Sequence, residues 1–215
     1  LKPTLKSSDG VKEFMVEASA NPNVIGVITW CHTFSPAKMW IRGLEVLTKP
    51  LLQLATQHHK EIPWETIDMD FMNLNQAAHG DREFGYIVSR LGIKRKVVVG
   101  HYTDPEVAEK LGTWARACAG WDASNNMKVM RWGDNMRNVA VTEGDKTEAE
   151  RVFGASINTW AVNELVAAYD AVKDDQVKEI IEDYKAKYDV DPALLDAKYD
   201  SLFLSLIHIS EPTRP

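Results

Sequence analysis

The residues with the clearest capacity for chemistry are Gln76, His79 and Glu83, which are spaced i, i+3 and i+7 along the chain. On a helix this spacing places the three side chains on one face. A glutamine carboxamide both donates and accepts hydrogen bonds, and a histidine can bond a hydroxyl or carbonyl oxygen in either tautomer. We therefore interpret this face as suited to a polyol. The alternative is a solvated or capped helix face that binds no ligand.

Two aspartates upstream, Asp68 and Asp70, raise the alternative of a divalent-metal cluster with His79 and Glu83. Carboxylate and imidazole groups are common metal ligands. We disfavour this cluster because the spacing matches no recognised ligand pattern. The adjacent pair His58–His59 is disfavoured as well, since neighbouring side chains diverge in regular structure, and a surface position is expected for it.

A second candidate site contains Phe34, in the segment from Trp30 to Pro36 that joins an expected strand to an expected helix. Open α/β sheets place ligands where strands end and helices begin. Phe34 could supply an apolar wall for the carbon face of a sugar, beside the free amides of the helix N-terminus. The alternative is that Phe34 packs in the core and Ser35 only caps the helix.

A third candidate is Met136, in the segment Gly133–Arg137. Glycine and asparagine permit a tight turn here, which would present Met136 as a flexible apolar contact. Core filling by Met136 is an equally good alternative. The chain contains no glycine-rich phosphate loop, dinucleotide fingerprint or serine nucleophile elbow. Nucleotide-dependent and serine-hydrolase chemistry are therefore unsupported.

The candidate residues must be held in place by regular elements. Short apolar runs alternate with amphipathic stretches along the chain, and this pattern predicts strands that alternate with helices. The run 24–30 is nearly continuous and β-branched, as in a strand covered on both faces. The remaining expected elements are strands at 50–55 and 96–101 and helices at 36–47, 73–91 (interrupted by Gly80 and Gly85) and 106–119. The prediction is an α/β fold with an open, mostly parallel sheet and flanking helices, of Rossmann-like type.

Beyond Asn126 the pattern changes, with strand-like arms at 127–132 and 138–142 and helices at 159–171 and 176–188. We interpret this as the helical start of a second α/β domain. The expected organisation is an incomplete N-terminal α/β domain over 1–135, the start of a second α/β domain over 136–203 and a non-native tail over 204–215. The tail looks like a translated sequencing adapter, and a genuine short strand is the alternative.

The composition is typical of a globular protein and gives no indication of nucleic-acid binding or of a membrane span. The 215 residues are 45% hydrophobic and 26% charged, with a net charge of -6 at pH 7. Nucleic acid is not an expected partner, because phosphate neutralisation needs clustered basic residues and only Lys94, Arg95 and Lys96 are adjacent. No membrane span or leader is indicated, and Cys31 and Cys118 show no disulfide spacing, so a cytoplasmic location is expected.

Three segments, 33–40, 62–85 and 133–137, together resemble the L-arabinose isomerase family. The resemblance covers most of the chain and implies interconversion of L-arabinose and L-ribulose. It also implies subunits of three α/β parts, identical subunits as partners in trimers or hexamers, and a divalent cation, typically Mn2+, held between neighbouring chains. The matching positions imply an aldose pocket lined by Phe34, Gln76, His79 and Met136, with Gln76 and His79 reaching it from the adjacent subunit.

The sequence departs from the family pattern in one major respect. The family's metal ligands, two Glu and two His, and the Glu pair that moves the proton belong to a later half that this sequence does not contain. We therefore expect a fragment with no catalytic residue and no metal ligand, which also lacks the strand that opens the first domain. The competing hypothesis is a metal-free sugar-binding or regulatory α/β module. Since the family accepts both arabinose and galactose, the preferred sugar is not specified.

Overall fold

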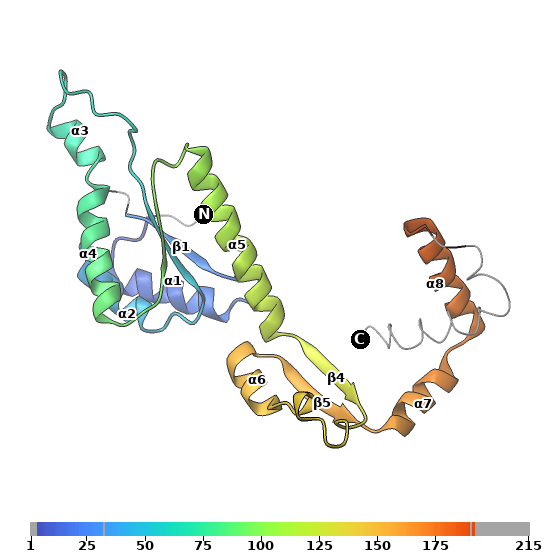
Figure 1. Ribbon diagram of the computed structural model, residues 1–215. Helices are drawn as coiled ribbons and strands as arrows, with labels where there is room; N and C mark the ends of the chain where they lie inside the picture. Colours follow the sequence, from blue (N-terminus) through green and yellow to red (C-terminus); the bar gives the residue numbers. More distant parts are fainter. Residues whose placement is uncertain (1–3, 32, 190, 192–215) are drawn as a thin grey trace. The chain divides into compact units, whose positions relative to one another are not determined.

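The structure is a computed structural model and describes residues 4–31, 33–189 and 191. The chain divides into two compact units, Leu1–Asn125 and Asn126–Pro215, each of which is described by itself. This division falls earlier than the boundary expected after residue 135. Each unit contains a parallel sheet with flanking helices (Figure 1). The predicted α/β class with open parallel sheets is thus confirmed.

The first unit is built on a three-stranded parallel sheet of order β1-β2-β3. Its strands are β1 (Val27–Thr29), β2 (Leu51–Ala55) and β3 (Lys96–Val99). The register places Val27 beside Leu51 and Gln53 beside Val97. All three strands run in one direction, so their carboxyl ends meet at a single edge, where open sheets bind ligands.

Six helical segments accompany this sheet: α1 (Ser8–Ala20), the 3-10 helix η1 (Ala37–Trp40), α2 (Ile41–Leu44), α3 (Met69–Leu74), α4 (Ala77–Arg90) and α5 (Pro105–Asn125). Successive residues of β2 face opposite sides of the sheet. Leu51 packs with side chains of α1 and α4, whereas Leu52 and Leu54 pack with α5. Helices therefore cover both faces of the central strand, which explains why four of its five residues are apolar.

Two helix predictions in this unit are wrong in detail. The expected helix 36–47 is a 3-10 turn followed by the four residues of α2. Gly43 lowers helix propensity there, and its backbone lies so close to α1 that a Cβ would be 2.7 Å from Val11. The expected helix 73–91 breaks between Leu74 and Ala77, and not at Gly80 or Gly85. α1, which the sequence analysis does not predict, begins at an N-cap formed by Ser7.

Over its described residues, the second unit contains a two-stranded parallel sheet, three α-helices and a 3-10 helix. Its elements are β4 (Lys128–Trp132), the 3-10 helix η2 (Ala140–Thr142), α6 (Lys146–Phe153), β5 (Ser156–Trp160), α7 (Val162–Ala171) and α8 (Asp174–Lys187). The expected second strand at 138–142 is wrong, because Asn138 has a left-handed backbone (φ 62°) and a 3-10 turn follows it. β4 pairs instead with β5, the segment in which a helix was expected to begin. Gly154 ends α6 in the left-handed conformation (φ 75°), and the extended strand β5 begins two residues later.

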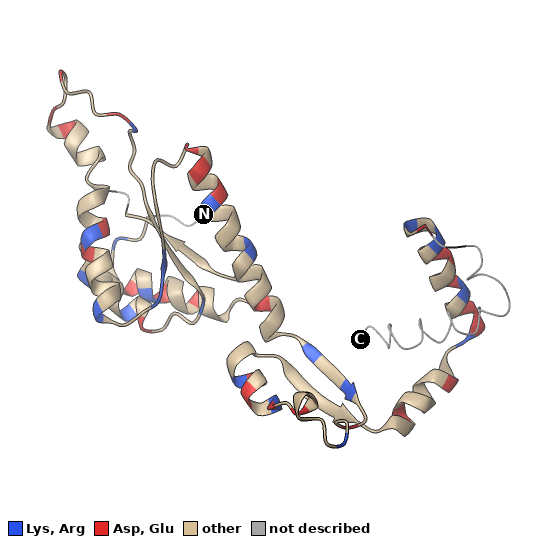
Figure 2. Ribbon diagram, viewed as in Figure 1, with Lys and Arg blue, Asp and Glu red and all other residues tan. Residues whose placement is uncertain are grey.

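Charged residues of both signs are interspersed along the helices, as Figure 2 shows for α4 and α8. In α8 they pair, with Lys185 to Glu182 at 2.8 Å and Lys187 to Asp183 at 2.8 Å. Over the described residues, no helix is both long and apolar enough to cross a membrane. The expected tail 204–215 lies outside the described residues.

Candidate functional site

The loop after β1 brings Phe34 onto α4. The rings of Phe34 and His79 lie 4.7 Å apart between centroids, tilted by 57°. Phe34 is 47% exposed and His79 is also exposed, so this aromatic pair faces outward. The alternative that Phe34 fills the core is therefore wrong. An exposed aromatic ring beside an imidazole offers an apolar wall next to a hydrogen-bonding group.

Gly80 allows the loop to approach the helix this closely. A Cβ at position 80 would stand 3.0 Å from the Cys31 Cβ, 3.0 Å from the Ser35 backbone nitrogen and 3.1 Å from the Ser35 Cβ. Real Cβ atoms rarely have such close neighbours, and backbone atoms cannot move aside alone. Glycine at this helical position thus sets the distance between the loop and α4.

Glu83 fastens the same loop to α4. Its Oε2 accepts a hydrogen bond of 3.0 Å from the backbone N–H of Ala37, the first residue of η1. The expected cap, Ser35, plays another part: its hydroxyl accepts a bond of 3.2 Å from the Trp40 indole N–H. The Trp40 ring packs edge-on against buried Phe84. Glu83 therefore acts as a structural clamp, although the sequence analysis placed it on the polyol face.

Gly80→Ala is expected to lower the free energy of unfolding by about 1–3 kcal/mol, the usual cost of overpacking a filled contact. The measurement is the urea midpoint of the dilute chain, followed by circular dichroism. Gly120→Ala is the matched control, because Gly120 is also helical but its Cβ would meet nothing within 4 Å. That change should raise stability by up to about 1 kcal/mol through helix propensity. Equal midpoints for the two variants would contradict the close approach at Gly80.

The other two predicted ligand residues are Gln76 in the first unit and Met136 in the second. Gln76 is the residue immediately before α4, and its side chain makes no capping hydrogen bond. Met136 belongs to the second unit and is 65% exposed, in the loop after β4. Beside it, Asn135 donates from its amide nitrogen to Glu143, while its Oδ1 is buried with no partner among the described residues. From its sequence context Asn135 is expected only to form a turn, whereas a buried acceptor without a donor is an uncommon feature that no sequence signal reveals.

A partly buried chain of hydrogen bonds joins β2 to α4. Arg95 donates to Gln53 Oε1 at 2.9 Å, and Gln53 Nε2 donates to Asp81 Oδ1 at 3.2 Å. Burial raises the pKa of Asp81. Burial, with the nearby Asp81 charge, raises the pKa of the Cys31 thiol to about 12. Cys31 therefore stays a neutral thiol at physiological pH and is not a nucleophile.

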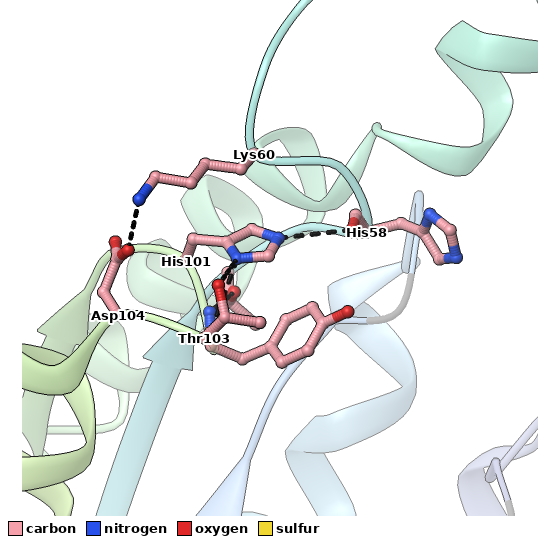
Figure 3. A network of polar contacts seen from close by, with 7 residues as sticks. His58, Lys60, His101, Thr103 and Asp104 are labelled. Atoms are coloured by element: carbon pink, nitrogen blue, oxygen red, sulfur yellow. Dashed lines mark hydrogen bonds and ion pairs between the residues drawn. The ribbon is translucent and has the colours of Figure 1, made fainter.

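A second polar network surrounds the carboxyl end of β3 (Figure 3). The Thr103 backbone N–H donates to His101 Nδ1 at 3.4 Å. Since Nδ1 accepts this bond, the proton of the neutral imidazole lies on Nε2. Nε2 in turn contacts the His58 carbonyl oxygen at 3.2 Å. Lys60 pairs with Asp104 at 2.6 Å, and its hydrogen bond holds the pKa of that carboxyl below the usual value. These bonds fix the loop at 58–60 against the loop after β3.

The metal-cluster alternative gains no support from this geometry. Asp68 caps α3, because its Oδ1 accepts from the Phe71 N–H at 2.8 Å. Throughout the part of the chain that the structure describes, no group of three or more His, Cys, Asp or Glu side chains could hold a metal ion. The histidine pair is closer than expected, since the Nδ1 atoms of His58 and His59 are 3.2 Å apart.

Comparison with known proteins accounts for both units. Residues 1–126 match the family described as the L-arabinose isomerase N-terminal domain, and residues 128–206 match the L-arabinose isomerase central domain. The chain belongs to the L-arabinose isomerase family. The family resemblance inferred from three short segments is thereby confirmed, and the two matched regions meet close to the division between the two units.

Individual family members are similar over nearly the whole chain. The L-arabinose isomerase of Bifidobacterium longum (strain NCC 2705) is 99% identical over 205 residues, which cover 95% of this chain and 41% of that protein. That of Bifidobacterium animalis subsp. lactis (strain AD011) is 82% identical over the same shares. That of Mycolicibacterium smegmatis is 53% identical over 88% of this chain and 38% of its own length. The chain thus spans about two fifths of the length of these L-arabinose isomerases.

Proposed function

We propose that this chain is part of an L-arabinose isomerase and supplies sugar-contacting side chains for the interconversion of L-arabinose and L-ribulose. The observation that carries the proposal is the outward-facing Phe34–His79 pair, with ring centroids 4.7 Å apart. In this proposal Phe34 packs against the carbon face of the sugar in its own subunit's pocket. His79 and Gln76 bond the oxygens of a sugar held by the adjacent subunit, as the family resemblance implies. Family membership supports the proposed reaction, and the exposed pair supports the proposed role of this chain in it.

Met136, in the second unit, is proposed as a further sugar contact because the family resemblance implies it. Its exposed thioether is an adaptable apolar contact. The neighbouring Asn135 Oδ1, buried and without a donor among the described residues, could accept a bond from a sugar hydroxyl. These side chains bind and orient the substrate, and we assign no proton transfer to any of them.

The resemblance implies Mn2+ for the whole enzyme, but the described side chains do not fit such an ion. Their His, Cys, Asp and Glu residues form no group of three that could hold one. The roles proposed for Phe34, Gln76 and His79 therefore do not involve the ion. When bound elsewhere in the enzyme, a divalent cation would polarise the sugar oxygens.

Identical subunits are the proposed partners. The arm between β2 and α4 exposes a run of apolar side chains that its own unit does not cover: Ile62, Trp64, Ile67, Met69, Met72 and Leu74. Among them Trp64 is 77% exposed. Exposed apolar patches of this kind are typical of protein interfaces. A cytoplasmic location is proposed as well, in keeping with the free cysteines Cys31 and Cys118.

Phe34→Ala, made in a full-length L-arabinose isomerase that carries this segment, tests the proposal. Loss of the apolar wall is expected to raise KM for L-arabinose about 5- to 10-fold, because an exposed aromatic contact contributes about 1 kcal/mol. Initial rates of L-ribulose formation give KM and kcat. Phe34→Leu keeps an apolar side chain, so its KM for L-arabinose should stay close to that of the unchanged enzyme. An unchanged KM in Phe34→Ala would place the sugar elsewhere.

A further inference from the structure

A cavity of about 430 Å3 opens at the carboxyl ends of β2 and β3 and involves neither Phe34 nor Gln76. Its lining comes from four parts of the first unit: the end of β2 and the loop after it, α4, and the end of β3. The residues that carry the argument are Thr56, His59, Lys60, Asp81 and Arg82. This volume is ample for a small metabolite, and the strand ends of an open sheet are a usual place for one.

Arg82 supplies the strongest charge in the lining. It is exposed on α4, and over the described residues no hydrogen bond or ion pair engages its guanidinium. Lys60 is the second cation, and it pairs with Asp104, which is outside the lining. Neither a guanidinium nor an ammonium can accept a hydrogen bond. Arg82 is therefore the unpaired cation of the lining among the described residues.

The neutral groups of the lining also act as donors. Asn75 donates from Nδ2 to the Phe71 carbonyl and accepts from the His59 N–H through Oδ1, which fixes its amide orientation. Its Nδ2 is 3.0 Å from His59 Nδ1, so that nitrogen accepts and the neutral ring carries its proton on Nε2. The Thr56 hydroxyl accepts from the Tyr102 N–H and keeps its own proton to donate.

The one carboxyl group in the lining is already engaged. Asp81 accepts bonds from the Gln53 amide and from the Cys31 thiol. Burial raises its pKa, which lessens its negative charge relative to an ordinary aspartate at a given pH. Repulsion of an incoming anion by Asp81 is therefore reduced. Since Lys60 is paired with Asp104, Arg82 is the cation of the lining that no carboxylate compensates among the described residues.

We propose that this cavity binds the phosphate group of a small phosphate monoester, with Arg82 as its principal partner. Guanidinium forks match the geometry of phosphate oxygens, and several donors can converge on a group that only accepts. A neutral sugar suits the site less well, because polyol hydroxyls need acceptors as well as donors. The site is separate from the proposed sugar contacts, although Arg82 also borders the hollow beside His79.

Isothermal titration calorimetry of the 215-residue chain with glycerol 3-phosphate is the test, and glycerol is the uncharged comparison ligand. Saturable binding of glycerol 3-phosphate and none of glycerol is expected. Arg82→Gln should weaken binding at least tenfold, and Lys60→Gln should weaken it less. Arg90→Gln is the matched control: it removes the same charge from the same helix, at a residue that lies over Tyr86 and outside the cavity.

Three results would overturn the proposal. The first is no saturable heat with either glycerol 3-phosphate or inorganic phosphate. The second is an unchanged affinity in both Arg82→Gln and Lys60→Gln, each first shown by circular dichroism to be folded. The third is an equal loss in Arg90→Gln, which would indicate diffuse charge attraction in place of a site. The sugar assays with Phe34→Ala are independent of all three, so either proposal can fail alone.

Discussion

No L-ribulose is expected when the purified 215-residue chain is incubated with L-arabinose and Mn2+ or another divalent cation. The described residues offer no group of three side chains able to hold a metal ion, and the chain spans 41% of the relatives from Bifidobacterium longum. General acid–base catalysis alone contributes about 10²–10⁴-fold to an enzymatic rate, and a metal contributes further. Losing both should bring turnover below detection.

The assay is the formation of L-ribulose over hours, compared with a blank of metal and sugar. A full-length L-arabinose isomerase that carries the same segment is the positive control under the same conditions. Turnover above the blank that disappears when the metal is chelated would contradict the expectation. It would also return Asp68, Asp70, His79 and Glu83 to consideration as ligands.

The strands of the first unit could be located from sequence because short, mostly apolar runs mark them. Burial on both faces holds only for β2, since Val98 is the one buried residue of β3 and Ile28 of β1 is 40% exposed. The expectation that the run 24–30 is covered on both faces is therefore wrong. β2 is apolar except for Gln53 and β3 is apolar after Lys96, and the structure places both strands within a residue or two of expectation. β5 escaped prediction because Ser156–Trp160 mixes polar and apolar side chains, and only its pairing with β4 makes it a strand. α1 had a usable signal in its serine cap and in the helical spacing of Val11, Met15 and Ala18.

The candidate site could be predicted only where its residues share an element. Spacing along α4 pointed to His79, but the contact with Phe34 depends on a loop more than forty positions away in sequence. Glu83 shows the limit of the pattern, because nothing in its spacing reveals that it bonds the Ala37 N–H, 46 positions distant. The cavity that Arg82 and Lys60 line had no sequence signal, since the strand ends that form it meet only in the folded sheet.

Replacing His79 by Ala in a full-length L-arabinose isomerase that carries this segment is expected to lower kcat/KM about 10- to 100-fold. A hydrogen bond from a neutral group is worth about 0.5–1.5 kcal/mol and one from a charged group about 1.5–3 kcal/mol. The change also removes the ring beside Phe34, which stands 4.7 Å away between centroids. Both losses act on the sugar, so the affinity for Mn2+ measured without sugar should stay nearly constant.

The measurement that separates a sugar contact from a metal ligand is a Mn2+ titration of His79→Ala beside its kinetics. His58→Ala is the control, since it removes an exposed histidine outside the proposed pocket and should leave kcat/KM unchanged. A ligand role predicts the opposite pattern, because removing one ligand typically weakens metal binding at least as much as catalysis. A large loss of Mn2+ affinity would therefore show that His79 holds the ion. If His79 touches only the sugar, His79→Ala should lose activity while its affinity for Mn2+ stays constant.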